Sequence, residues 1–186
     1  MTRAAKALIL AGLLLLAMSL GALLLLQLAD RKAAHSAQAL LQQLDRLLPP
    51  SSPGVPETYR VPEMPALEVA GQNIVAILEI PAFGLRLPVL QSWEQGSAHG
   101  LPRRFSGSAY DGSLIIGGSA ALFQCFNQIP NGTEVTVTDM RGAVFTYTVT
   151  RIGRSLTADP DTLSGSILTL FTRPKTSLEY ILLRCN

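Results

Sequence analysis

An uncharged apolar run near the start of the chain is too long for a typical element of a small soluble domain. It extends from Ala7 to Ala29, and most of its positions are Leu, Ala or Ile. As a helix these 23 residues would extend roughly 35 Å at about 1.5 Å per residue. A bilayer core of about 30 Å needs about 20 apolar residues. The run therefore predicts a membrane anchor within residues 1–29 that is retained as a single-pass helix.

Two other interpretations of the run stay open. A cleaved signal peptide has an apolar core of roughly 7–15 residues and a small-residue cleavage site, whereas this run is longer and is followed by no clear A-x-A site. A buried helix of a soluble domain is the third interpretation.

The positive charges on the two sides of such an anchor nearly balance. The amino terminus, Arg3 and Lys6 precede the run, and Arg31 and Lys32 follow it. They slightly favour a cytoplasmic N-terminus, with the C-terminal domain outside the cell membrane.

The rest of the composition excludes several classes of function. The formal net charge is +2, and no basic stripe is interleaved with aromatic residues, so nucleic acid is not an expected partner. No cluster of His, Cys, Asp and Glu has ligand spacing, so no metal or other cofactor is expected. Cys125 and Cys185 are the only cysteines. A disulfide between them and two separate buried thiols are both compatible with the sequence.

The chain changes character twice after the apolar run. Leucines and alanines at intervals of three and four predict a helical stalk over residues 30–48. Residues 49–70 form a predicted proline-rich, extended linker, and the six prolines within residues 49–65 predict no regular structure there. Residues 71–186 form the predicted β-barrel domain.

Alternation of apolar and polar residues dominates the last part of the chain and is typical of short strands separated by Gly, Pro, Asn and Asp. The predicted strands are Asn73–Ile80, Ser113–Gly118, Thr133–Asp139, Ala143–Ile152, Ile167–Phe171 and Tyr180–Cys185. Between the third and fourth, "DMRGA" predicts a hairpin turn in which Gly142 takes a positive φ. So many short strands predict a mainly β domain, either a closed barrel or a sandwich.

Several ordered motifs resemble the sortases, most closely the class B-like sortases of clostridial Gram-positive bacteria. The resemblance covers residues 73–185. Its motifs are "ILEIPAFGLRLPVL" (Ile77–Leu90), "RRFSGSAYDGSLIIGGS" (Arg103–Ser119), "NGTEVTVTDMRGAVFTYTVTRI" (Asn131–Ile152), "LTADPDTL" (Leu156–Leu163), "LTLFT" (Leu168–Thr172) and "ILLRC" (Ile181–Cys185). The resemblance implies an eight-stranded β-barrel on a membrane anchor. It also implies transpeptidation, in which a cysteine thiolate cleaves a sorting signal, a histidine acts as acid or base and an arginine stabilises the oxyanion.

All three catalytic positions of that family carry other residues here. Ser119 stands in the place of the histidine, and its hydroxyl cannot exchange protons near neutral pH as an imidazole does. Arg173 directly follows "LTLFT" in the place of the cysteine, and a guanidinium is not a nucleophile. Tyr180 falls where the arginine begins the last strand. Loss of one member of such a set already removes most of the rate.

The sequence therefore predicts a non-catalytic, cell-surface pseudo-sortase. Its expected partners are a sorting-signal peptide, a pilin or a catalytic sortase. The alternative is a divergent sortase-type transpeptidase or hydrolase. Its substitute residues would be Cys125, His99, or Ser119 assisted by Asp139 or Glu179.

Overall fold

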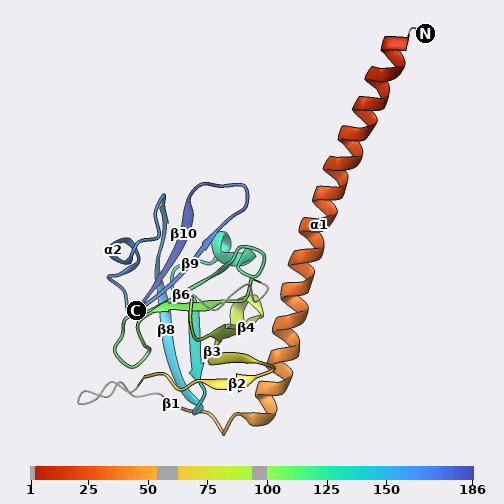
Figure 1. Cartoon of the computed structure of the whole chain (residues 1–186). Helices are drawn as coiled ribbons and strands as arrows, with labels where there is room; N and C mark the ends of the chain where they lie inside the picture. The colour runs from red at the N-terminus through yellow and green to blue at the C-terminus, as the bar shows by residue number, and fades with distance from the viewer. Residues whose placement is uncertain (1–2, 54–62, 94–99) are drawn as a thin grey trace.

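The computed structural model describes residues 3–53, 63–93 and 100–186. Its first element is one continuous helix, α1 (Arg3–Leu47), whose C-terminal part lies beside the barrel and whose N-terminal part extends away from it (Figure 1). The predicted anchor and stalk are thus consecutive parts of one helix. Within the described residues, no helix combines the length and the apolarity that crossing a membrane requires.

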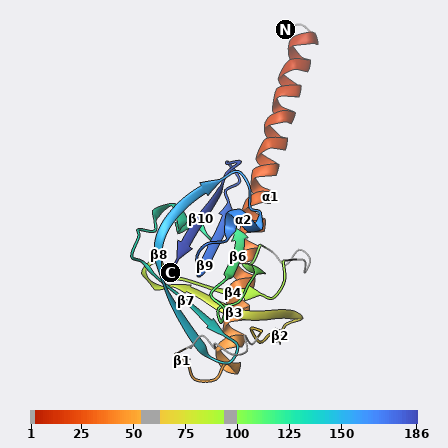
Figure 2. The same ribbon diagram turned by 90° about the vertical axis from the view of Figure 1, so that its left-hand side faces the viewer.

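Eight strands close into a barrel, as the family resemblance implies (Figures 1 and 2). Around the ring they are β3 (Gln72–Ile80), β4 (Leu85–Leu90), β5 (Arg103–Ser106), β6 (Leu114–Ser119), β9 (Leu168–Arg173), β10 (Tyr180–Cys185), β8 (Ala143–Ser155) and β7 (Glu134–Asp139), which pairs with β3 again. Neighbours are antiparallel except for the parallel pairs β4–β5 and β6–β9. The closed-barrel prediction is confirmed.

The remaining elements are short. The predicted linker contributes β1 (Ser52–Pro53), parallel to β8, and β2 (Leu67–Val69), antiparallel to β3. The expectation that residues 49–65 have no regular structure is therefore wrong at β1, which pairs with a strand of the barrel. The strand β2 follows that proline-rich stretch within the predicted linker. Two 3-10 helices, η1 (Pro81–Phe83) and η2 (Gln124–Gln128), and one short α-helix, α2 (Pro160–Leu163), complete the described chain.

The main core is continuous between the barrel interior and one face of α1. The inward positions of β6 and β9 are apolar, with Leu114, Ile116, Leu168 and Leu170 nearly inaccessible to solvent. From α1, four residues at helical spacing join the same core: Ala37, Leu40, Leu41 and Leu44. The spacing puts them on one face of the helix.

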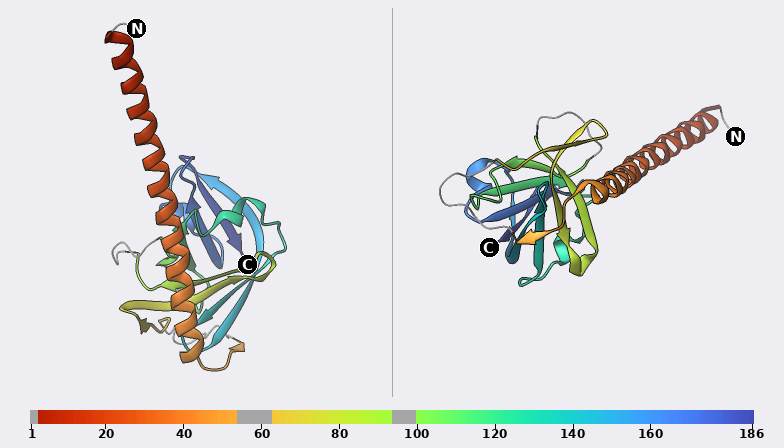
Figure 3. Two further views of the ribbon diagram at one scale, coloured as in Figure 1. Left: turned by 90° about the vertical axis from the view of Figure 1, so that its right-hand side faces the viewer. Right: turned by 90° about the horizontal axis from the view of Figure 1, so that it is seen from below.

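An ion pair lies at one end of the stretch of α1 that packs along the barrel. The guanidinium of Arg86, at the start of β4, donates two hydrogen bonds to the carboxylate of Asp45, at 2.6 and 3.0 Å. At the other end of the packed stretch, Ala33 is buried beside Gly100: a β-carbon on Gly100 would lie 3.8 Å from that of Ala33. Seen from below, α1 lies against the outside of the barrel (Figure 3).

The six strands predicted from alternation are all present, with ends shifted by no more than three residues. Gly142 has φ of 81°, as the predicted turn requires. Alternation alone missed β4 and β5. Pro88 interrupts the pattern of β4, and β5 has only four residues and begins with two arginines.

Candidate functional site at the ends of β6, β9 and β10

The barrel brings together the three residues that the sequence resemblance predicts at the family's catalytic positions. In the parallel pair β6–β9, Ser119 and Arg173 are register partners at the strand ends. In β10, Ile181 pairs with Thr172, so Tyr180 comes next to Arg173. All three alternate with residues of the main core and therefore lie on the outer face of the barrel. The guanidinium carbon of Arg173 lies over the ring of Tyr180, 5.4 Å from its centroid.

Ser119 packs against the backbone of Gly100, which lies beside Ala33 of α1. Its N–H donates to the carbonyl of Gly100 at 3.3 Å, and a β-carbon on Gly100 would lie 3.0 Å from its Oγ. The Oγ is buried and has no hydrogen-bond partner among the residues that the structure describes. A serine nucleophile needs an adjacent base to accept its proton. Within the described part of the chain, no such base contacts this hydroxyl.

Arg173 contributes a cation rather than a nucleophile. It is exposed, whereas the preceding Thr172 is buried and donates from Oγ1 to the carbonyl of Gly118 at 2.8 Å. That hydrogen bond fixes the ends of β6 and β9 to each other. A guanidinium held over an aromatic ring can still present its outer N–H groups to a carboxylate or a carbonyl.

Next to these positions, the outer face carries an aromatic patch formed by Trp93, Phe105, Phe171 and Tyr180. Ring centroids of Trp93, Phe105 and Phe171 are 5.5–5.6 Å apart in all three pairs. Phe171 also contacts Tyr180 at 6.1 Å. Such distances are typical of favourable aromatic pairs. Sequence reasoning did not identify Trp93 and Phe105 as part of a site, because the four rings come from separate segments.

Gly117 makes room for this patch. A β-carbon at Gly117 would lie 2.5 Å from Cζ of Phe171 and 2.6 Å from Cζ3 of Trp93. The outer face of β6 therefore has no side chain where the two rings cover it. Absence of a side chain here, rather than backbone conformation, explains the glycine.

Gly117→Ala is expected to displace the ring of Trp93 from β6. Trp93 is the only tryptophan, so its emission should shift to the red and become more accessible to a soluble quencher. The matched control is Gly153→Ala in β8, where the nearest atom to a new β-carbon is 4.0 Å away and emission should not change. An unchanged Trp93 spectrum in Gly117→Ala would contradict this packing.

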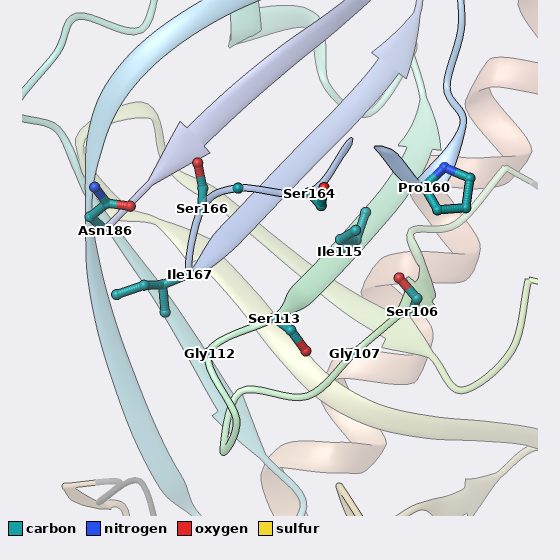
Figure 4. A pocket seen from close by; sticks show the side chains of 11 residues that line it. Ser106, Gly107, Gly112, Ser113, Ile115, Pro160, Ser164, Ser166, Ile167 and Asn186 are labelled. Atoms are coloured by element: carbon teal, nitrogen blue, oxygen red, sulfur yellow. The ribbon is translucent and has the colours of Figure 1, made fainter. Parts of the chain in front are cut away.

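One cavity borders the patch, and a second adjoins the first. One, of about 610 Å³, is lined by Gln91, Trp93, Arg104 and Phe105 among others. The other, of about 780 Å³, is lined chiefly by serines, glycines, Ile115 and Pro160, and lies toward the opposite end of β6 and β9 from Ser119 and Arg173 (Figure 4). Ser106 and Gly107 border both cavities. The two adjoining cavities thus form a groove on the outer face, with aromatic rings at one end and hydroxyl groups at the other. The cation of Arg173 lies beyond the aromatic end, over the ring of Tyr180.

Neither cysteine is in an environment that favours a nucleophilic thiolate. Cys125 and Cys185 are both free thiols. Burial raises the pKa of the Cys125 thiol, and it raises that of Cys185 to about 12, so each forms less of the nucleophilic thiolate at neutral pH than an ordinary cysteine.

The two carboxylates considered as partners for Ser119 have other contacts. Asp139 is buried and accepts from Tyr110 and the β7–β8 turn, and Glu179 pairs with Arg154 at 3.5 Å. His99 lies outside the described residues. Among the residues that the structure describes, no group of three His, Cys, Asp or Glu side chains is arranged to hold a metal ion.

No protein-family model matches the sequence, and no curated protein matches it. Solved structures do match the barrel. Sortase A from Corynebacterium diphtheriae superposes with a TM-score of 0.54 at 19% identity, over 62% of this chain and only 60% of that one. Sortase C-3 from Streptococcus pneumoniae has a TM-score of 0.54 at 17% identity, over 85% of this chain and 82% of that one.

A Clostridium perfringens sortase D5 transpeptidase also has a TM-score of 0.54, at 14% identity, over 61% of this chain and 78% of that one. These three structures are sortases of types A, C and D, so the likeness to class B stays a prediction. At such identities the match concerns the fold and carries no activity with it. The barrel of this chain has a sortase-like fold.

Proposed function

We propose that this protein is a membrane-anchored, non-catalytic module that binds an extended peptide on the outer face of its sortase-like barrel. The observation that carries the proposal is the juxtaposition of Ser119, Arg173 and Tyr180 at adjoining strand ends. These positions correspond to the family's catalytic set, and they hold a hydroxyl, a guanidinium and a phenol. The strands that would position the catalytic groups are present, whereas the cysteine, histidine and arginine of the family are replaced by other residues.

The groove has features suited to a peptide ligand. A six-residue strand such as β6 is about 20 Å long at roughly 3.3 Å per residue, so a peptide of similar length could lie along it. The half-exposed ring of Trp93 and its aromatic neighbours would contact apolar side chains. Arg173 would hold a carboxylate or carbonyl of the peptide at one end. A sorting-signal peptide, a segment of a pilin or a segment of a catalytic sortase would fit this description.

Exposed apolar side chains on α1 support membrane anchoring. Leu14, Leu15, Leu16, Met18 and Leu20 are each between 62% and 68% exposed. Large apolar side chains rarely form such a continuous exposed surface in water, and hydrocarbon would cover them at no cost. The proposed location is the cell membrane, with the barrel on the extracytoplasmic side.

The test compares the full chain in detergent with a variant in which the family's catalytic residues are restored: Ser119→His, Arg173→Cys and Tyr180→Arg. Each is incubated with an immobilised library of sorting-signal peptides, and bound and cleaved peptides are identified by mass spectrometry. The natural chain should retain peptides uncut. The restored variant should cut some of the same peptides and form a thioacyl adduct on residue 173, because the register places that residue beside residue 119.

Four control variants separate the possible outcomes. Gly117→Ala disturbs the aromatic patch and should reduce retention, whereas Gly153→Ala should not. Cleavage by the natural chain would overturn the non-catalytic proposal and support a divergent transpeptidase or hydrolase. Loss of that cleavage in Ser119→Ala or Cys125→Ala would then identify the nucleophile. Absence of retained peptides in the natural chain would overturn the peptide-binding function.

A further inference from the structure

Two exposed leucines lie at one end of the barrel, on the connections next to the candidate site. Leu178, between β9 and β10, is 82% exposed, and Leu156, directly after β8, is 71% exposed. Tyr180 pairs with Ser155, so the two connections are neighbours. We call residues 154–156 and 173–180 the tip. Its leucines are more exposed than any of the five exposed apolar side chains of α1 named above.

The tip lies on the side of the barrel toward which the N-terminal part of α1 extends. Asp45 is bound to Arg86 at the β3–β4 end, and Ala33 is packed near Ser119, whose register partner is Arg173. Residues of α1 before Ala33 therefore continue past the tip end, and three views agree on this direction (Figures 1, 2 and 3).

The spacing along α1 places the tip close to the membrane, if α1 is anchored as proposed above. The apolar run ends at Ala29, four residues before Ala33, which is about 6 Å of helix. The polar layer on each side of a bilayer is roughly 5–7 Å thick. The ends of β6 and β9 are then at about the depth of the lipid headgroups, and the connection between β9 and β10 lies beyond them.

The side chains of the tip suit that depth. Besides the leucines, it carries Arg154, Arg173 and Lys175 and one carboxylate, Glu179, which pairs with Arg154. The nearby α2 region adds Asp159, whose carboxylate caps that helix by accepting from Thr162 N–H, and Asp161. Leucine beside arginine and lysine is typical of segments that enter the boundary between headgroups and acyl chains of anionic membranes.

We propose that the tip lies in the anionic headgroup layer of the membrane that α1 enters, with Leu156 and Leu178 reaching the upper acyl chains. The barrel is then held by two contacts with the bilayer rather than by α1 alone. The Arg173 end of the groove opens at the membrane surface. A bound peptide would have its end at Arg173 in or next to the headgroup layer.

The test uses the full chain reconstituted into vesicles of phosphatidylcholine and phosphatidylglycerol. Trp93→Phe removes the only tryptophan, and Leu178→Trp then places a single fluorophore at the tip; Leu156→Trp does the same at the second position. Lipids brominated near the top of the acyl chains serve as quenchers. The matched control is Ile167→Trp in the same background. Ile167 is 43% exposed and lies directly before the first residue of β9, at the end of that strand away from the tip.

We expect blue-shifted emission and several-fold stronger quenching at positions 178 and 156 than at position 167. Quenching at the tip should fall when phosphatidylglycerol is left out, because the headgroup charge is lost. Equally weak quenching at all three positions, in a chain that floats with the vesicles, would overturn the tip contact and leave anchoring intact. A chain that does not float with vesicles would overturn the anchoring and, with it, this inference.

Discussion

A chain that begins at residue 49 is expected to lose cooperative folding, whereas a chain that begins at residue 31 should keep it. The difference between them is the part of α1 that packs on the barrel. Leu40, Leu41 and Leu44 are between 0% and 8% exposed and belong to the same core as the barrel interior. Full burial of one leucine contributes about 1.5–3 kcal/mol. Three together are comparable with the whole stability of a domain, about 5–15 kcal/mol.

Urea denaturation measures this difference. Tryptophan emission reports the barrel through Trp93, and circular dichroism reports the backbone. The longer chain should show one cooperative transition with both probes. The shorter chain should show a broad change and bind a dye that detects exposed apolar surface. A single sharp transition in the shorter chain would mean that the predicted boundary at residue 71 separates the barrel from an independent stalk.

The same segment shows what the sequence can and cannot predict. The spacing of leucines in residues 30–48 identified a helix and its apolar face. It did not identify the surface that covers this face, because the approach of Ala33 to Gly100 depends on how helix and barrel dock. Period-two alternation identified six strands, since their inward positions need apolar residues whatever the strand order.

The sequence likewise predicted one part of the candidate site and missed another. Ser119, Arg173 and Tyr180 were predicted because ordered motifs resemble the sortases and align these residues with the positions that carry the chemistry in that family. The aromatic patch was not found, because no local pattern indicates that Trp93 and Phe105 meet Phe171. Gly117 was the one available signal: a glycine in the middle of an apolar strand often marks close approach of another group.

Asp139→Ala is expected to lower the free energy of unfolding by about 3–5 kcal/mol, with a decrease in melting temperature of about 10 °C. The side chain is fully buried at the end of β7. Its Oδ2 accepts from the hydroxyl of Tyr110 at 2.6 Å. Its Oδ1 accepts from the N–H groups of Arg141 and Ala143, at 2.8 and 2.9 Å, across the turn that Gly142 completes. Removing the carboxylate leaves three donors without their acceptor.

Tyr110→Phe is the matched comparison, because it removes one donor and keeps both contacts in the turn. It should lower the free energy of unfolding by about 1–2 kcal/mol. The double variant should lower the free energy of unfolding by less than the sum of the two single variants. Once the hydroxyl of Tyr110 has been removed, loss of the carboxylate deprives only the two N–H groups of the turn of their acceptor. If Asp139→Ala cost under about 1 kcal/mol in urea denaturation, water would be replacing the carboxylate. The β7–β8 turn, which joins two walls of the barrel, would then be held by Gly142 and the strand ladder rather than by this buried charge.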